Sequence, residues 1–153
     1  MPVTTAPDTR TITAAGRRVG YIVSIAINAV ILYAANRSPG WDVVPFLTDR
    51  TPEVLGLVNA SLIAGIIANF VYVVWDPPRL RAFGDLVTLS IGIAAMTRIW
   101  QVFPFDFSAY SFNWEVVARI LLGLGIAGSA IAIIVALVTL VRGRPRYDGD
   151  QSL

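Results

Sequence analysis

Two arginines lie inside otherwise apolar stretches of the chain. Arg98 interrupts the stretch that begins at Leu86, and Arg119 precedes 22 residues without a charge (120–141). A guanidinium presents N–H donors in a planar fork that matches a phosphate or a carboxylate. An ionisable group inside a membrane span is a functional candidate by default, because leaving it unpaired is costly. Arg98 and Arg119, together with Gln101 and Glu115, are therefore candidate residues for binding an anion or a lipid headgroup.

The same residues also have a purely structural interpretation. Gln101 lies about one turn from Arg98, and Glu115 lies four residues before Arg119, the spacing of a helical ion pair. Long arginine side chains near a helix end can extend toward the headgroups and pair there with Glu115, Asp106 or an acidic residue of the first outer loop, residues 36–53. We favour this structural pairing over an open anion site.

The segment LLGLGIAGSA (121–130) contains the pattern G-x-G-x-x-G. This pattern binds a dinucleotide only where it follows a strand and opens a helix, whereas here it lies inside the uncharged stretch. At helical spacing its glycines precede small residues by one turn, which lets another helix backbone approach closely. We predict a helix-packing surface inside the bundle, with self-association as the alternative; it comprises Gly123, Gly125, Ala127, Gly128 and Ser129.

Three polar side chains lie inside the first two apolar stretches. Ser24 and Asn28 are four residues apart and share a helix face, and Asn69 falls at a matching depth in the second stretch. Hydrogen bonds between such groups in a membrane are modest, about 0.6–2 kcal/mol each. These residues predict an inter-helix polar network with a structural role.

The absence of histidine and cysteine excludes several classes of chemistry, including Cys/His zinc sites, thiolate nucleophiles and His-dependent catalysis. The ten acidic residues lie in loops, in tails or near helix ends. Among them, Asp85 can pair with Arg81 four residues earlier, and Asp76 can cap the helix that follows it. We therefore expect no enzymatic activity, no metal site and no cofactor.

The composition is that of a membrane protein. Of the 153 residues, 56% are hydrophobic and only 14% are charged, whereas charged residues make up about a quarter of a soluble domain. Four stretches are long enough to cross a bilayer, and we expect helices at about residues 19–36, 54–75, 78–103 and 114–141. The flanking segments, 1–18 (predicted to be disordered) and 142–153, are expected to be cytoplasmic tails.

The arginines orient these helices, because cytoplasmic flanks retain positive charge. Only Arg37 and Arg50 fall on the side opposite the termini, whereas eight arginines fall on the same side as both termini: Arg10, Arg17, Arg18, Arg79, Arg81, Arg142, Arg144 and Arg146. The sequence thus predicts an all-α, four-helix transmembrane bundle in the cell membrane, with both termini cytoplasmic.

Two short outer loops, residues 36–53 and 104–113, are rich in aromatic side chains, which commonly settle at the headgroup level. No nucleic-acid-binding patch is present, so the expected partners are membrane lipids and either another membrane protein or a second copy of the chain. The function that these features favour is that of a small non-enzymatic accessory or scaffold subunit. The alternative is an outer-leaflet lipid or anion binder that uses Arg98 and Arg119.

Overall fold

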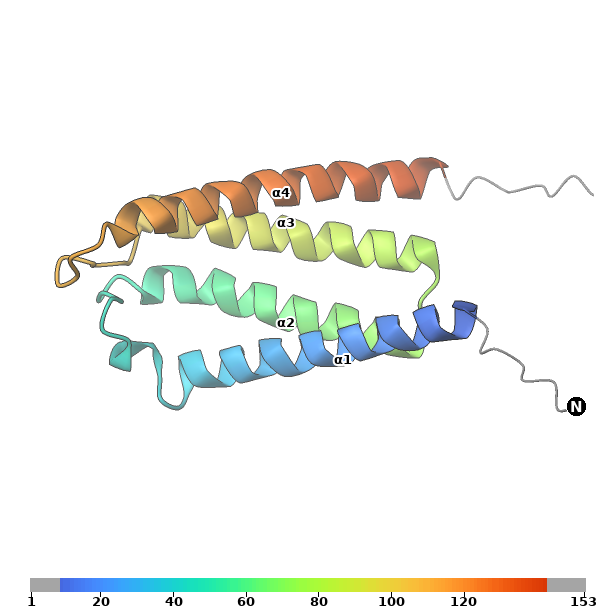
Figure 1. Ribbon diagram of the computed structural model, residues 1–153, viewed down its shortest axis with the longest axis horizontal. Helices are drawn as coiled ribbons and strands as arrows, with labels where there is room; N and C mark the ends of the chain where they lie inside the picture. The colour runs from blue at the N-terminus through green and yellow to red at the C-terminus, as the bar shows by residue number, and fades with distance from the viewer. Residues whose placement is uncertain (1–8, 143–153) are drawn as a thin grey trace, which may run out of the picture.

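The computed structural model describes residues 9–142, which form four long helices joined by loops (Figure 1). In chain order the elements are α1 (Thr9–Asn36), the 3-10 turn η1 (Trp41–Val43), α2 (Pro52–Val74), α3 (Pro78–Val102) and α4 (Trp114–Arg142). Each of the four long helices contains a stretch that is long and apolar enough to cross a membrane. The predicted all-α architecture with four candidate spans is therefore confirmed, as in a multi-pass membrane protein.

The helix bounds agree with the prediction except at the start of the chain. α1 begins at Thr9, so residues 9–18 are helical and do not form the predicted disordered segment. Residues 9–18 contain no proline, so the apolar stretch can propagate the helix outward through polar residues. The remainder of the predicted tails, residues 1–8 and 143–153, lies outside the described residues.

Prolines mark the helix boundaries. Pro52 and Pro78 begin α2 and α3, where a missing N–H costs nothing because the first turn has no partner for it. Pro77 is the N-cap of α3, and Asp76 does not cap the helix as the sequence suggested. α3 ends at Val102, and its C-cap, Phe103, adopts a left-handed backbone conformation with φ of 43° and is followed by Pro104.

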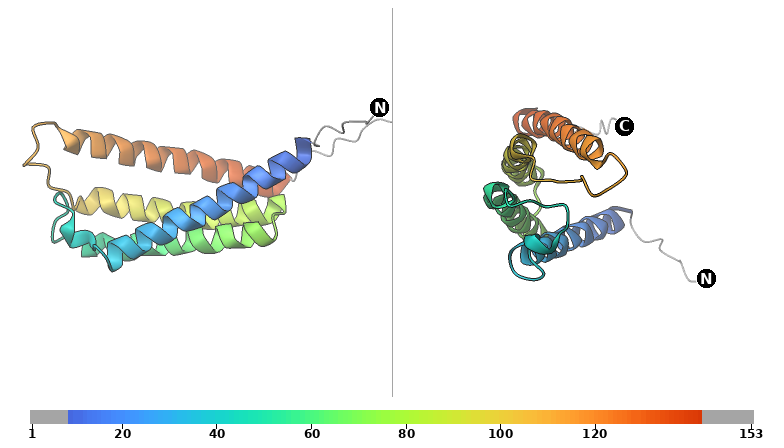
Figure 2. Two further views of the ribbon diagram at one scale, coloured as in Figure 1. Left: turned by 60° about the horizontal axis from the view of Figure 1, so that its bottom comes forward. Right: turned by 90° about the vertical axis from the view of Figure 1, so that its left-hand side faces the viewer.

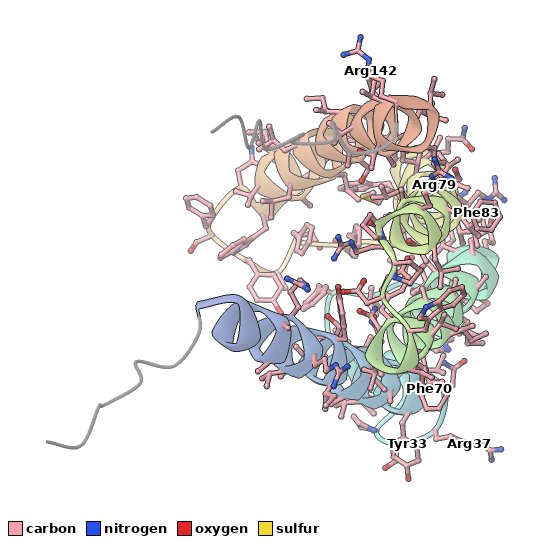
Figure 3. All side chains as sticks on the ribbon, turned by 90° about the vertical axis from the view of Figure 1, so that its right-hand side faces the viewer. Tyr33, Arg37, Phe70, Arg79, Phe83 and Arg142 are labelled. Atoms are coloured by element: carbon pink, nitrogen blue, oxygen red, sulfur yellow. The ribbon has the colours of Figure 1, made fainter. Side chains whose placement is uncertain are left out.

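The bundle is open along one side. α2 contacts α1 and α3, and α3 contacts α4, but α1 and α4 make no contact with each other. Seen along its long axis, the molecule therefore has a C-shaped cross-section (Figure 2, right; Figure 3). The start of α1, the α2–α3 turn and the end of α4 lie together at one end, called here the terminus end, and the two longer loops form the loop end (Figure 1).

The surface of the described helices is strongly apolar. Phe70 and Phe83 are 62% and 58% exposed and point away from the bundle (Figure 3). Fully buried side chains are few because most of each helix faces outward. A surface of this kind is unfavourable in water and suits a surrounding of lipid chains, which are as apolar as leucine.

The two loops at the loop end are joined by backbone hydrogen bonds. The N–H of Asp106 donates to the carbonyl of Phe46 at 2.9 Å, and that of Thr48 donates to Pro104 at 3.1 Å. The ring of Phe107 stacks on that of Phe46, with centroids 5.7 Å apart. The loops thus form one cap over the ends of α2, α3 and α4.

Candidate functional site

Arg119 is held by an ion pair and by an aromatic ring. Its Nε and Nη2 donate to Glu115 Oε1 at 3.2 and 3.1 Å, so the predicted pair one helical turn apart is present. Its guanidinium carbon also lies 4.1 Å from the ring centroid of Phe103, within the range of a cation–π interaction. The Arg119 side chain therefore connects α4 to the end of α3.

Arg98 pairs with a carboxylate of another helix. Its Nη2 lies 3.5 Å from Oε2 of Glu53, while Arg50 Nε donates to Oε1 of the same residue at 3.1 Å. The Gln101 side chain is exposed and forms no hydrogen bond within residues 9–142. Arg98 and Arg119 thus pair with different carboxylates, of which Glu53 is shared between Arg98 and Arg50. No hydrogen bond or ion pair among the described residues joins Arg98 to Arg119.

The predicted inter-helix network of Ser24, Asn28 and Asn69 does not form. Asn28 donates to the carbonyl of Ser24 at 2.9 Å, and Asn69 donates to that of Gly65 at 2.7 Å, each within its own helix. In both cases the acceptor is the carbonyl one turn earlier, the nearest group that can satisfy an amide. An inter-helix amide pair forms instead between Asn36 and Asn59, which exchange two hydrogen bonds of 2.8 and 2.7 Å.

The predicted packing surface of α4 divides between two environments. A Cβ added to Gly125 would lie 2.8 Å from Met96 Sδ, and one added to Gly123 would lie 3.8 Å from the Trp100 ring, so both glycines adjoin α3. Gly128 has no atom within 4 Å of the same position. Ala127 is exposed and Ser129 is half-buried. Part of this surface therefore packs inside the bundle, and Gly128 lies open.

A polar cluster at the terminus end connects three parts of the chain and was not predicted as a unit. Asp76, between α2 and α3, accepts hydrogen bonds from Arg17 (3.3 Å) and Tyr21 (3.2 Å) of α1 and from Arg81 of α3 (3.3 Å). Arg81 thus pairs with Asp76, whereas the sequence suggested Asp85. One feature of the sequence could have indicated this cluster: Tyr21 lies near the same end of the bundle as Arg17 and Arg81.

Tyr72 is the buried centre of this cluster. It is only 4% exposed, and its hydroxyl donates toward the carbonyl of Arg81 at 3.0 Å and Asp85 Oδ1 at 3.1 Å. Its ring meets that of Tyr21 edge to face, with centroids 5.4 Å apart. The terminus-end cluster, meaning Arg17, Tyr21, Tyr72, Asp76, Arg81 and Asp85, therefore ties α1, α2 and α3 together.

Several hollows adjoin α4, and two of them lie near its opposite ends. The α3–α4 cavity, near the terminus end, has a volume of about 660 Å³ and includes Arg81, Asp85, Thr88 and Thr139 in its lining. The aromatic pocket, at the loop end, has a volume of about 470 Å³ and is lined by Phe46, Phe107, Tyr110, Trp114, Val117, Ala118 and Leu121. Within residues 9–142 no three acidic side chains cluster closely enough to hold a metal ion.

The arrangement supplies paired charges, apolar hollows and an open helix face. Comparison with known proteins adds no family to these observations: no protein-family model matches the chain, and neither a curated protein nor a solved structure matches it.

Proposed function

We propose that the protein is a small non-enzymatic accessory or scaffold subunit of the cell membrane, with both termini in the cytoplasm. The observation that carries this proposal is the open side of the bundle, where α1 and α4 leave each other uncontacted. In a four-helix protein without a binding partner, we would expect α1 and α4 to pack against each other and close this side.

The open side includes a strip of α4 that a further helix can approach. Leu121 lines the aromatic pocket, and Ala132 and Thr139 line the α3–α4 cavity. Gly128 lies seven residues after Leu121 and four before Ala132, and so falls on the same helix face between the two hollows. Phe46, from the loop between α1 and α2, shares the aromatic pocket with α4, so this face looks toward the α1–α2 half. Small residues on such a strip allow close approach of another backbone.

The test is native mass spectrometry of the protein extracted from its own membrane in mild detergent. We expect a stoichiometric companion, either another membrane protein or a second copy, that is lost in Gly128→Leu while the isolated protein keeps its thermal stability. Ala130→Leu, an exposed position on another face of α4, is the matched control and should retain the companion. A protein that is always recovered alone, or a companion unaffected by Gly128→Leu, would contradict the proposal.

The second candidate is an outer-leaflet lipid or anion binder. Its support is the partial exposure of the Arg98 and Arg119 side chains, 43% and 39%. It ranks second because each guanidinium is already ion-paired, Arg119 with Glu115 and Arg98 with Glu53, a carboxylate that Arg50 shares. If the arginines bind lipid, Arg98→Gln and Arg119→Gln should each reduce retained anionic lipid, whereas Arg37→Gln, at the same end and in no ion pair among the described residues, should not. Equal lipid retention in all three variants would exclude this candidate.

A further inference from the structure

Asp85 differs from the other acids of the described helices. Glu53 and Glu115 are both ion-paired, whereas no cationic side chain of residues 14–142 lies within ion-pair distance of Asp85. The two arginines of the terminus-end cluster, Arg17 and Arg81, both pair with Asp76. Asp76 thus forms two ion pairs, whereas Asp85 forms none and interacts only at longer range with the charge of Arg81, one turn earlier.

The unpaired acid lies within a helix that is long enough to span a bilayer. Asp85 is about 10 Å beyond the start of α3 at the usual rise of a helix. One of its oxygens, Oδ1, accepts the hydrogen bond from Tyr72, and the other accepts no hydrogen bond from any described residue. An acid in this position is costly unless a partner compensates its charge.

The free side of Asp85 borders the α3–α4 cavity, which supplies further acceptors. Thr88 and Thr139 both line this cavity, and each hydroxyl already donates its hydrogen to a carbonyl of its own helix, at 3.0 Å to Gly84 and 2.9 Å to Val135. Their oxygens therefore remain as acceptors. Arg81 also borders the cavity, but its Nη1 is bonded to Tyr21 and Asp76. Three acceptor side chains thus meet one hollow of about 660 Å³.

We propose that the α3–α4 cavity binds the ammonium group of a lipophilic primary amine, with Asp85 as the charge partner. A primary ammonium carries three N–H donors, which matches the acceptors of Asp85, Thr88 and Thr139. Apart from Arg81, the remaining lining is apolar and suits a hydrocarbon tail; it includes Leu89, Ala132 and Val135. The volume lies within the usual range of small-molecule pockets, about 300–1,000 Å³. The proposal does not depend on the scaffold role, but the two share a surface, because Ala132 and Thr139 also lie on the strip of α4 where we place the companion.

The depth of Asp85 favours a free amphiphilic amine over a phospholipid headgroup. In an aminophospholipid the amine lies farther from the acyl chains than the phosphate does. Arg81, the group that would meet the phosphate, is one turn closer to the start of α3 than Asp85. A lipid bound to both residues would therefore have to place its amine deeper than its phosphate.

The test measures saturable binding of octylammonium to the full chain in nanodiscs of phosphatidylcholine, a lipid that contains no primary amine. Asp85→Asn keeps the shape and the acceptor for Tyr72 but removes the charge, and it should weaken binding by roughly tenfold or more. Asp49→Asn makes the same chemical change at an exposed position of the loop end and should leave binding unchanged. Octyltrimethylammonium, which has no N–H donor, should bind more weakly than octylammonium.

A second variant covers the case in which Asp85→Asn does not fold. Thr139→Val removes one acceptor from α4 while preserving its size, and it should weaken octylammonium binding several-fold. The proposal is overturned if the wild-type protein shows no saturable binding of octylammonium, if octyltrimethylammonium binds equally well, or if folded Asp85→Asn or Thr139→Val protein binds octylammonium as tightly as the wild type.

Discussion

Gly84→Ala should destabilise the fold by closing the space that Tyr72 occupies. An added Cβ at Gly84 would collide with the Tyr72 hydroxyl and would lie 3.0 Å from Cζ of the ring. Tyr72 cannot move without cost, because its hydroxyl is bonded to Arg81 and Asp85 and its ring packs edge to face on Tyr21. A single methyl group is therefore expected to disturb the contact that joins α2 to α3.

The magnitude follows from the contacts that would be lost. Overpacking a tightly filled site costs about 1–3 kcal/mol. Displacing Tyr72 also weakens the hydrogen bonding of its single O–H, which is shared between Arg81 and Asp85 and contributes roughly 0.6 kcal/mol within a membrane. Gly92→Ala is the matched control, because it lies on the same helix with no atom within 4 Å of the added Cβ. Both variants gain the same helix propensity, so Gly84→Ala should be less stable than Gly92→Ala by about 2–4 kcal/mol.

Reversible unfolding in mixed micelles, followed by circular dichroism as the denaturing detergent is raised, measures this difference. Equal unfolding free energies for Gly84→Ala and Gly92→Ala would refute the reasoning, because they would mean that Tyr72 is not packed against Gly84. Repeating the measurement in a second detergent should give the same difference in unfolding free energy between the two variants, which would show that the difference does not depend on the micelle.

Three further predictions concern the loop end and the α1–α2 contact. A double-mutant cycle of Asn36→Ala and Asn59→Ala should give a coupling of about 0.6 kcal/mol, and additive effects would show that the amide pair contributes nothing. Glu115→Gln should lower thermal stability by less than about 1 kcal/mol, because both Glu115 and Arg119 are partly exposed; a larger loss would indicate further contacts. The backbone N–H of Ser108 donates to the Asp106 carboxylate and lowers its pKa below the ordinary value of 3.8. The stabilisation of the loop by this hydrogen bond is therefore fully present above pH 3.8, and it is lost as the pH falls through the lowered pKa. An NMR titration midpoint at or above 3.8 would contradict this.

Local features were predictable because they depend on few residues. Helix positions follow from the length of the apolar stretches, and the pair of Glu115 with Arg119 follows from helical spacing alone. The choice between alternative partners depends on tertiary structure. Arg81 has acids four residues later and five residues earlier, and it pairs with the earlier one, Asp76, because Tyr21 and Arg17 of α1 meet at the same carboxylate.

The glycines of α4 show the same limit of local patterns. The spacing of Gly123, Gly125 and Gly128 predicts that a helix can approach, but it does not identify which face meets α3. The structure places Gly125 against Met96 and leaves Gly128 open. The open side of the bundle could not be predicted for a related reason: the residue pattern of α1 predicts a helix but does not indicate whether this helix packs against α4.

The orientation of the four helices decides which leaflet each candidate site faces. Because the chain contains no cysteine, a single introduced thiol reports the position of one residue. We expect an impermeant maleimide to label Ser111→Cys, an exposed loop-end position, in intact cells and to label Ser152→Cys, near the C-terminus, only after lysis. This result would place Arg98 and Arg119 toward the outer leaflet and the α3–α4 cavity toward the cytoplasmic one, so an amine would enter from the cell interior. Labelling of Ser152→Cys alone in intact cells would refute the orientation drawn from the arginines and would reverse both assignments.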